Sequence, residues 1–487
     1  MIFNSVTYLL FLGVTVGLFW LLPKRPRLWL IFLASSTFYG FWRPEFLAVM
    51  FLSAATDYFV ALRMEATEVQ ARRRGWLLLS LGVNLGLLGY FKYLFFIVDN
   101  AVAVLNLLGA EVRAPALNIV LPLGISFYTF ETISYVVDVY RRFIPAERSF
   151  VMYGCFVTFF PKLVAGPILR AAEMLPQFTA EPVFRPGAFV SGLRRIVFGL
   201  FLKVALADNL APLVDDGFMQ PIAALSALDV LTLAFLFGFQ IYFDFSAYSS
   251  IAIGSARLMG IHVPENFNFP YVASSPRDFW RRWHISLSSW IRDYLYLPLL
   301  GVKVRDRSSG GLSVDVGTPG QATRHPLFAL FMTWAVMGLW HGANWTFVLW
   351  GLYHASLIAG YRTLAGQTVS LPVWLRVWGG RFITLPLVML GWIPFRAQSV
   401  DDALAMFAKL TSPQNYLWLG MRENTYLIAA LVFLASFIAY LMHEYGERYI
   451  RRWIWMDFAL ETMTMSVVLA LVFVFLRPIN QFIYFQF

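Results

Sequence analysis

Two histidines of this 487-residue chain stand where they could act on a proton, each in an apolar segment rich in tryptophan. His341 ends a long apolar run in GLWHGANW (338–345), and His284 follows two arginines and a tryptophan in FWRRWHISLSSW (279–290). A neutral imidazole can both accept and donate a proton near pH 7, so His341 is a candidate general base. Taken alone, His341 fits equally well a helix cap or a packing residue bonded to a carbonyl group.

Other polar side chains accompany these histidines. Asn344 stands three residues after His341, and on one continuous helix it would share a face with His341 and orient its ring. Asp244 lies in the apolar run QIYFDFSAY, where an ionisable group is costly and usually faces the protein interior. Residues 276–298 mix arginine with tryptophan, which predicts an amphipathic helix at the membrane interface with His284 pointing inward; a surface helix anchored to headgroups is the alternative.

Several other kinds of site are excluded or weakly supported. The single cysteine, Cys155, excludes an internal disulfide and a multi-cysteine zinc or iron–sulfur centre. No two histidines have the spacing of a helical metal site, and His443-Glu444 lacks the second histidine of HExxH. We therefore expect no bound metal. His354 is expected to be structural, and Ser126 has only part of the context of a hydrolase nucleophile.

The composition places these residues in a membrane protein. The chain is 59% hydrophobic and 14% charged, whereas soluble proteins are about 25% charged. At roughly 20 apolar residues per crossing it could form about ten helical spans, which predicts an all-α, multi-pass fold in one domain, residues 1–487. The net charge of +10 comes largely from short loops such as 24–27 and 72–74. This is the positive-inside pattern of cytoplasmic loops and does not resemble a nucleic-acid groove.

The apolar segments predict where the chain crosses the membrane. The first segment carries its charge after the apolar stretch, so we expect an uncleaved span with the amino terminus outside the cytoplasm. Residues 117–140, 150–169, 186–213 and 228–255 carry proline, glycine or charged interruptions, which predicts broken or re-entrant helices around a functional interior. Residues 301–325, rich in glycine, serine and charge, are expected to form a solvated cytoplasmic loop. Further spans are expected at 6–22, 28–42, 46–62, 76–98, 326–342, 346–362, 381–396, 424–442 and 460–476.

Separate motifs carry a resemblance to a known family. The stretches WRRWHISLS (280–288) and WHGANW (340–345) are a specific signal because they occur together and in this order. Further matching stretches are YFKY, LPLGISFYTFETISYVVDVYR, AGPI, LKVALADNL, QIYFDFSAYS and NFNFPY. The sequence resembles a bacterial member of the membrane-bound O-acyltransferase family, and most of all its alginate O-acetyltransferase branch, over most of the chain.

The resemblance implies a ring of roughly ten tilted transmembrane helices, with re-entrant and interfacial helices, around a central funnel. It assigns the invariant histidine of the family to His341 and the second active-site position to His284, for proton transfer or substrate positioning. The supporting residues are Trp340, Asn344 and Asp244. The implied acyl donor is acetyl-CoA, with no permanently bound cofactor. The implied partners are a periplasmic SGNH-type acetyltransferase and an exported polysaccharide, and the implied location is the bacterial inner membrane.

The carboxyl-terminal tail suggests an acyl carrier. The last span is preceded by several arginines and followed by Arg477 alone, so the positive-inside rule places residues 478–487 outside the cytoplasm. The tail PINQFIYFQF resembles the end of the small accessory peptide of the teichoic-acid D-alanylation system, which implies that Tyr484 carries an acyl group. A phenol needs a base such as His341 to become a nucleophile. An aromatic belt at the membrane interface is the alternative for this tail.

The resulting hypothesis is an O-acyltransferase that moves an acetyl group from cytoplasmic acetyl-CoA across the membrane toward hydroxyl groups of an exported polysaccharide. One alternative keeps the same residues but takes D-alanine or another acyl group from a carrier protein. A second alternative is a secondary transporter that uses Asp244, Glu131 and Asp138 as coupling groups. Such a transporter should show internal pseudo-symmetry, and the sequence shows no repeat.

Overall fold

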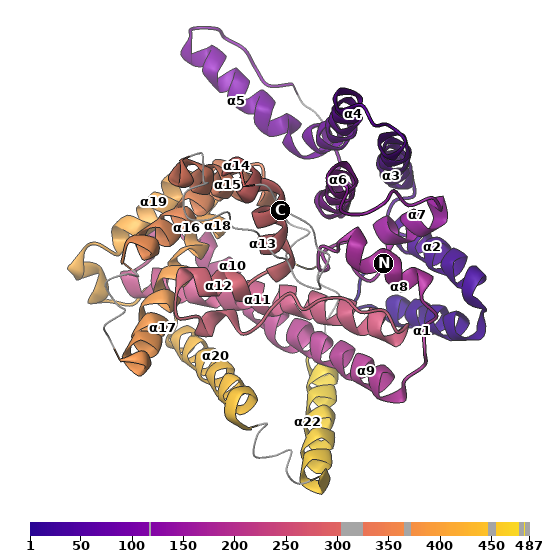
Figure 1. Cartoon of the computed structure of the whole chain (residues 1–487). Helices are drawn as coiled ribbons and strands as arrows, with labels where there is room; N and C mark the ends of the chain where they lie inside the picture. Colours follow the sequence, from indigo (N-terminus) through magenta and orange to yellow (C-terminus); the bar gives the residue numbers. More distant parts are fainter. Residues whose placement is uncertain (116–117, 303–324, 365–371, 447–453, 477–481, 483–487) are drawn as a thin grey trace.

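The fold is entirely helical in the part of the chain that the structure describes. The computed structural model describes residues 1–115, 118–302, 325–364, 372–446, 454–476 and 482 (Figure 1). Every regular element in these residues is a helix, which confirms the predicted fold class. Most of the predicted loop 301–325, and Tyr484 with nearly all of the predicted tail, lie outside the described residues.

The first third of the chain forms antiparallel helical hairpins close to the predicted spans. The helices α3 and α4 pack against each other and both contact α6, as Figure 1 shows. The helix α4 continues without a break through the π-helix η1 into α5, which projects away from the rest of the molecule and has no buried residues (Figure 1). The bounds are α1 (Val6–Leu21), α2 (Lys24–Gly40), α3 (Glu45–Glu65), α4 (Gln70–Leu88), η1 (Gly89–Tyr93), α5 (Leu94–Leu107) and α6 (Ile125–Tyr140).

The middle of the chain contains a predicted break in 150–169. Helix α7 (Phe150–Thr158) gives way to a buried, non-helical stretch at 159–170. Helix α9 (Pro186–Phe201) instead continues through the π-helix η2 (Leu202–Ala207), which holds Lys203, into α10 (Asp208–Met219). The predicted break in 186–213 is therefore wrong, because these residues form one continuous helical stretch with a π-helical segment. Irregular backbone at membrane depth is tolerated where protein satisfies it, and the break at 159–170 is buried in protein.

The predicted break in 228–255 is wrong, because α11 (Ala227–Leu258) is one continuous helix of 32 residues. It begins with a capping box in which Ser226 and Asp229 bond each other's backbone N–H groups. Helix α9 lies close along it, since a Cβ added to Gly254 would lie 2.7 Å from the carbonyl oxygen of Gly192. Small residues allow such close approach of helices. The helix α11 is therefore the buried axis on which the neighbouring elements pack.

The predicted amphipathic helix at 276–298 is also wrong. The segment breaks into α12 (Pro276–Arg282), α13 (Ile285–Ile291), the π-helix η5 (Arg292–Tyr296) and α14 (Leu297–Leu299). Its tryptophans Trp280, Trp283 and Trp290 are 7%, 2% and 6% exposed, so they are core residues and not interfacial anchors. The large apolar area of each indole is better removed from solvent.

The last third of the chain adds helices that surround this core. The helices α15, α16, α17 and α22, and the π-helix η8 (Met442–Gly446) that follows α20, lie next to regions outside the described residues (Figure 1). The bounds are α15 (Pro326–His341), α16 (Trp345–Leu364), α17 (Val373–Leu390), α18 (Trp392–Arg396), α19 (Val400–Lys409), α20 (Glu423–Leu441) and α22 (Ile454–Val474). The helix α8 (Ala171–Thr179) precedes α9 in the middle of the chain.

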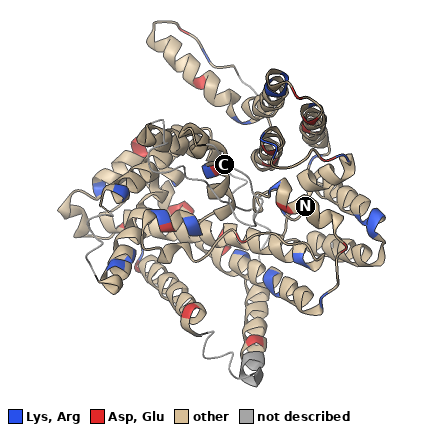
Figure 2. Cartoon of the chain, viewed as in Figure 1, with Lys and Arg blue, Asp and Glu red and all other residues tan. Residues whose placement is uncertain are grey.

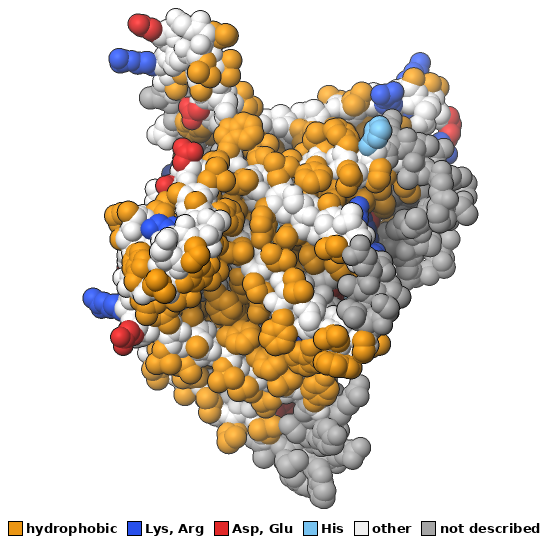
Figure 3. All heavy atoms as spheres, turned by 90° about the vertical axis from the view of Figure 1, so that its left-hand side faces the viewer, with side chains coloured by type: hydrophobic (Ala, Val, Ile, Leu, Met, Phe, Trp, Pro, Cys, Tyr) orange, Lys and Arg blue, Asp and Glu red, His pale blue; other side chains and the backbone are white. Residues whose placement is uncertain are grey.

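The exterior is that of a membrane protein. Within the described residues, six helices or continuous helical stretches are long and apolar enough to cross a bilayer. Three shorter apolar helices are Val6–Leu21, Pro326–His341 and Leu460–Val474. Figure 3 shows a face dominated by hydrophobic side chains, and Figure 2 shows that charged residues are sparse along the helices. The ring of roughly ten spans stays a prediction.

A buried ion pair joins α6 to the break after α7, and its removal should be costly. Lys162 and Glu131 form this pair with side chains 1% exposed, and Glu131 also accepts the backbone N–H of Leu169 at 3.0 Å. Replacing Lys162→Met leaves the carboxylate buried without its cation, so we expect the unfolding free energy to fall by about 3 kcal/mol. Thermal unfolding of the purified protein in detergent measures this.

A control variant and a double variant show whether the loss of stability comes from the buried ion pair. The exposed pair of Arg43 and Glu45 gives a control, since Arg43→Met should change stability by less than about 1 kcal/mol. The double variant Lys162→Met with Glu131→Gln should recover part of the loss. An unfolding temperature equal to that of the original chain in the Lys162→Met variant would contradict the assignment.

Candidate active site

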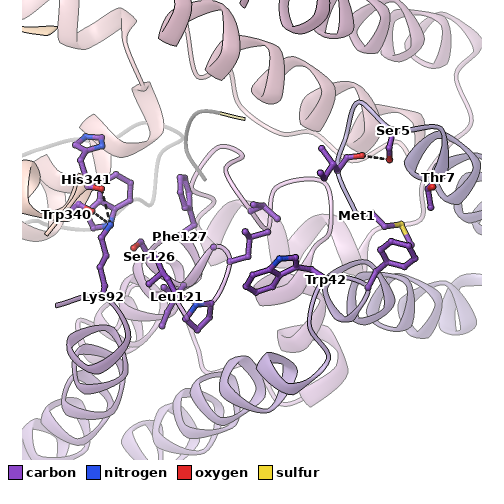
Figure 4. Close-up of a pocket in the computed structure, with 17 residues that line it drawn as sticks. Met1, Ser5, Thr7, Trp42, Lys92, Leu121, Ser126, Phe127, Trp340 and His341 are labelled. Atoms are coloured by element: carbon purple, nitrogen blue, oxygen red, sulfur yellow. Dashed lines mark hydrogen bonds between the residues drawn. The ribbon is translucent and has the colours of Figure 1, made fainter. Parts of the chain in front are cut away.

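A cavity of about 610 Å³ opens beside His341. Its wall comes from segments far apart in the sequence: the amino-terminal residues, the end of α2, the π-helix η1, the turn before α6 and the end of α15 (Figure 4). Its size falls in the range of small-molecule sites. Lys92, Trp340 and His341 stand together on one side of it, and Trp42 and Met1 lie farther along (Figure 4).

His341 is held at the end of a helix in an aromatic surrounding. It is the last residue of α15 and is 6% exposed. The next residue is extended, and a Cβ on Gly342 would lie 2.0 Å from the Phe347 ring, so only glycine fits this turn. The imidazole centroid lies 4.9 Å from the rings of both Trp340 and Trp350. The ring can therefore act on a group in the cavity from a surrounding that largely excludes water.

Lys92 is a site residue that the motif reading did not single out. Its ammonium donates hydrogen bonds to the carbonyl oxygens of Trp340 at 2.5 Å and His341 at 3.2 Å. The last carbonyl groups of a helix lack intrahelical partners, and a lysine can satisfy them. Tyr93 donates to the neighbouring carbonyl of Leu339 at 3.1 Å. The sequence does contain a signal for Lys92, because it is a lysine inside an apolar run. Burying a lysine there costs free energy unless it has such hydrogen-bond partners.

His284 lies at a strained corner. It joins α12 to α13 with a φ of 42°, in the left-handed region that side chains other than glycine rarely adopt. It is fully buried, and its ring centroid lies 4.6 Å from that of Phe245 and 6.4 Å from that of Trp340. Because Trp340 contacts both imidazoles, the structure brings the three predicted residues His341, His284 and Trp340 together.

Asn266 fixes this corner, and the sequence reading missed it as well. Its Oδ1 lies 3.2 Å from Nδ1 of His284 and accepts the backbone N–H and the hydroxyl of Ser286 at 3.2 and 2.9 Å. An Nδ1–H that donates to this oxygen leaves Nε2 as the basic nitrogen of His284. Asn266 belongs to NFNFPY, so its motif was noticed although its role was not.

Asn344 does not share a helix face with His341, contrary to the prediction. The helix α15 ends at His341, so the two residues share no helix face. Asn344 is exposed and its Oδ1 accepts the backbone N–H of Thr346 at 3.0 Å at the start of α16. The three-residue spacing was misread because the turn at Gly342 was not recognised.

Asp244 lies at a different place, in a cluster with Lys203 and Phe482. It accepts a hydrogen bond from the ammonium of Lys203 at 2.7 Å, and Asp208 lies 2.9 Å from the same nitrogen. Phe482, which is 1% exposed, packs its ring 4.5 Å from this ammonium and 5.1 Å from the ring of Tyr248. We call Lys203, Asp244, Tyr248 and Phe482 the tail contact.

The carboxylates of the transporter alternative are all engaged in the protein. Asp244 pairs with Lys203, and Glu131 pairs with Lys162. Asp138 accepts hydrogen bonds from the hydroxyl of Tyr294 at 2.8 and 2.9 Å. Such partners fit groups that hold helices together.

Comparison with known sequences establishes the family. The model of the membrane-bound O-acyltransferase family matches residues 144–313. The chain is 40% identical over 451 residues to the probable alginate O-acetylase of Azotobacter vinelandii, covering 92% of this chain and 85% of that protein. The chain belongs to the membrane-bound O-acyltransferase family. It is thus a multi-pass membrane protein and an O-acyltransferase, and the resemblance that its motifs carried is confirmed.

Two further similar proteins are named for polymers other than alginate. The chain is 36% identical over 408 residues to the peptidoglycan O-acetyltransferase of Helicobacter pylori, covering 78% of this chain and 73% of that protein. It is 29% identical over 254 residues to the teichoic acid D-alanyltransferase of Bacillus subtilis, covering 51% and 60%. The family model spans His284 and Asp244 and stops before His341.

The contact of Lys92 with the end of α15 yields a test within this family. In the variant Lys92→Met the two carbonyl oxygens lose their donor and the imidazole of His341 loses its fixed position. We expect kcat for acyl transfer to fall by about tenfold to hundredfold with KM little changed. Steady-state kinetics measure both constants. Lys92→Arg, which can still donate, should recover part of kcat, whereas an unaltered kcat in Lys92→Met would contradict a positioning role.

Proposed function

We propose that this O-acyltransferase takes an acetyl group from cytoplasmic acetyl-CoA and passes it toward hydroxyl groups of an exported polysaccharide, with His341 as the general base. The observation that carries the proposal is the place of His341, on the wall of the 610 Å³ cavity and closely surrounded by tryptophan rings. The relatives named for alginate and peptidoglycan acetylation support a polysaccharide as the final acceptor.

In the proposed reaction the acetyl group passes from the thioester of CoA to a hydroxyl oxygen, on which it forms an oxygen ester. The imidazole of His341 takes the proton of an acceptor hydroxyl while the hydroxyl oxygen forms a bond to the thioester carbonyl carbon. The carbon–sulfur bond breaks, and the departing thiolate of CoA takes the proton from the imidazolium. General-base catalysis contributes about 10²- to 10⁴-fold, and fixing the two reactants in the cavity adds to it.

Trp340 and His284 act beside this step. Trp340 lines the cavity and contacts both imidazoles, so it can hold the acyl group against His341. His284, whose Nδ1 lies beside Asn266, acts in proton transfer or in substrate positioning. Asp244 supports the site indirectly, at the tail contact, where it pairs with Lys203.

The acceptor in our proposal is the phenol of Tyr484, which carries the acetyl group before a second transfer. Phe482 is buried at the tail contact, and two residues of extended chain reach about 7 Å farther. Tyr248 also stacks on Phe3 with centroids 4.4 Å apart, next to the amino-terminal residues that line the cavity. In the second step a hydroxyl of a periplasmic SGNH-type acetyltransferase attacks the tyrosine ester, and the phenolate takes up its proton.

The same contacts support the proposed orientation. The amino terminus and Phe482 both lie at Tyr248, so they belong to one side of the protein. The charge pattern places the amino terminus and residues 478–487 outside the cytoplasm. We accordingly assign the chain to the bacterial inner membrane, with the loop 301–325 on the cytoplasmic side.

A second candidate function differs in the donor. The likeness to a teichoic acid D-alanyltransferase favours an acyl group delivered by a carrier protein, with the same residues at work. Labelling from free acetyl-CoA in the assay below separates the two candidates, because a carrier-dependent enzyme gives no transfer from the free CoA ester.

His341 is tested directly. The purified protein is incubated with acetyl-CoA labelled in the acetyl group, and the label transferred to protein is counted. His341→Ala should lower the rate at least about 10²-fold, the usual minimum for a lost general base. The matched control is His325→Ala, an exposed histidine at the other end of the same helix, which should keep the original rate. Undiminished transfer in His341→Ala would overturn the assignment.

The relay through Tyr484 is tested by the place of the label. In the original chain, peptide mass spectrometry should find the acetyl group on Tyr484. Tyr484→Phe removes only the hydroxyl and should abolish this labelling, while CoA ester binding persists. Tyr445→Phe, at an exposed tyrosine, is the control and should remain labelled at Tyr484. Labelling of the chain that survives Tyr484→Phe would exclude the relay and leave the interfacial belt as the role of the tail.

A further inference from the structure

Basic side chains surround a second cavity. It shares no lining residue with the cavity beside His341. This cavity of about 440 Å³ lies where α1 ends, α9 begins and α11 ends. Lys24, Arg27, Arg185 and Arg257 line it, with Glu181 as an acidic neighbour. In the part of the chain that the structure describes, none of these four cations is in an ion pair. We call this cavity the basic pocket.

The cations of the basic pocket are partly held in place. Arg27 donates from Nε to the carbonyl oxygen of Phe19 at 2.8 Å, and Arg257 donates from Nη1 to the hydroxyl of Ser191 at 2.8 Å. These bonds fix the side chains and leave their charge uncompensated. The first turn of α9 adds backbone N–H groups and the positive end of a helix dipole. The pocket therefore favours an anion with several oxygen atoms.

An apolar groove continues from the basic pocket. Its volume is about 880 Å³, and its wall is formed by α1, α9 and the end of α22. Trp20, Phe184, Phe189 and Leu258 line both cavities, so the two adjoin one another. We call this second cavity the groove.

The groove runs along most of the length of α1. Its residues on α1 recur at the spacing of one helix face, from Val6 near one end to Trp20 near the other. Gly13 and Gly17 belong to this face, and a Cβ added to either would meet nothing within 4 Å. The 16 residues of α1 correspond to about 24 Å of helix, most of the hydrocarbon thickness of a bilayer.

We propose that the basic pocket and the groove together bind one glycerophospholipid with an anionic headgroup, of the phosphatidylglycerol class. The phosphate lies among Lys24, Arg27, Arg185 and Arg257, and the acyl chains lie in the groove. Charge complementarity selects an anionic over a zwitterionic headgroup, because four cations face one carboxylate. The continuous apolar wall selects a lipid over a free phosphate, since a soluble anion would leave that wall unfilled.

The bound lipid joins α22 to the body of the protein. In the described residues α22 packs on α9 and η2, and its residues Leu469, Val472 and Phe473 form one wall of the groove opposite α1. Phe473 is 73% exposed in the protein alone. A lipid chain between α1 and α22 covers these side chains and replaces the helix contact that the groove lacks.

Binding is tested with the full chain in detergent, by native mass spectrometry against equal amounts of phosphatidylglycerol and phosphatidylcholine. We expect one retained phosphatidylglycerol per chain. The variant Lys24→Gln with Arg185→Gln should lose at least about tenfold of this preference, since each lost charge removes a charge-assisted hydrogen bond. The control is Arg72→Gln with Arg74→Gln, exposed basic residues at the start of α4, which should keep the preference.

The groove is tested separately by filling it. Gly17→Leu places a side chain in the open groove and should weaken retention of the lipid without unfolding the protein. Gly86→Leu, at an exposed glycine of α4 with equally open surroundings, is its control. Thermal unfolding follows the same samples: phosphatidylglycerol should raise the unfolding temperature, and inorganic phosphate or phosphatidylcholine should not.

Three results would overturn the proposal. Equal retention of the two lipids would show that the basic pocket selects no headgroup. Stabilisation by inorganic phosphate as large as that by phosphatidylglycerol would show an anion site without acyl chains. Unchanged retention in both the Lys24→Gln/Arg185→Gln and the Gly17→Leu variants would place any bound lipid elsewhere on the protein.

Discussion

The carbonyl groups at the end of α15 must find donors inside an apolar protein, and the ammonium of Lys92 supplies them. Without a donor, a helix that ends at depth in the membrane would leave unsatisfied oxygen atoms at a cost of several kcal/mol. If α15 continued beyond His341, its carbonyl groups would find partners within the helix. The imidazole of His341 would then lie on the side of a helix and not at its end. The end of α15 and its lysine therefore place the imidazole at the cavity wall.

A similar constraint applies to two other buried lysines. The ammonium of Lys162 donates to the carbonyl oxygen of Val157 at 3.0 Å, where α7 ends, and pairs with Glu131. Lys203 lies in the π-helix between α9 and α10 and pairs with Asp208 and Asp244. Among the described residues, Lys162 thus follows the end of a helix, and Lys92 and Lys203 each lie in a π-helical segment. Burying a lysine is costly, so its position marks a place where the backbone needs a donor or a carboxylate needs a partner.

Sequence patterns predicted the long elements well because hydrophobic runs of spanning length have few structural alternatives. The ends of α1, α3, α15 and α20 fall within a few residues of the predicted spans. Patterns failed where tertiary contacts override local preference. The corner at His284 needs the oxygen of Asn266, eighteen residues earlier in the chain, and no helical periodicity contains that contact. The separation of Asn344 from His341 likewise depends on one glycine packed against Phe347.

The tail contact shows how one buried charge can serve two structural purposes. The ammonium of Lys203 forms ion pairs with both Asp208 and Asp244 and at the same time faces the ring of Phe482 at 4.5 Å. A cation close to an aromatic face is attracted by the ring quadrupole, more strongly when both are removed from water. The two carboxylates keep the lysine charged at this depth, and the charged lysine holds the phenylalanine. The π-helix η2 thus connects the core of the protein to Phe482, which stands two residues before Tyr484 in the sequence.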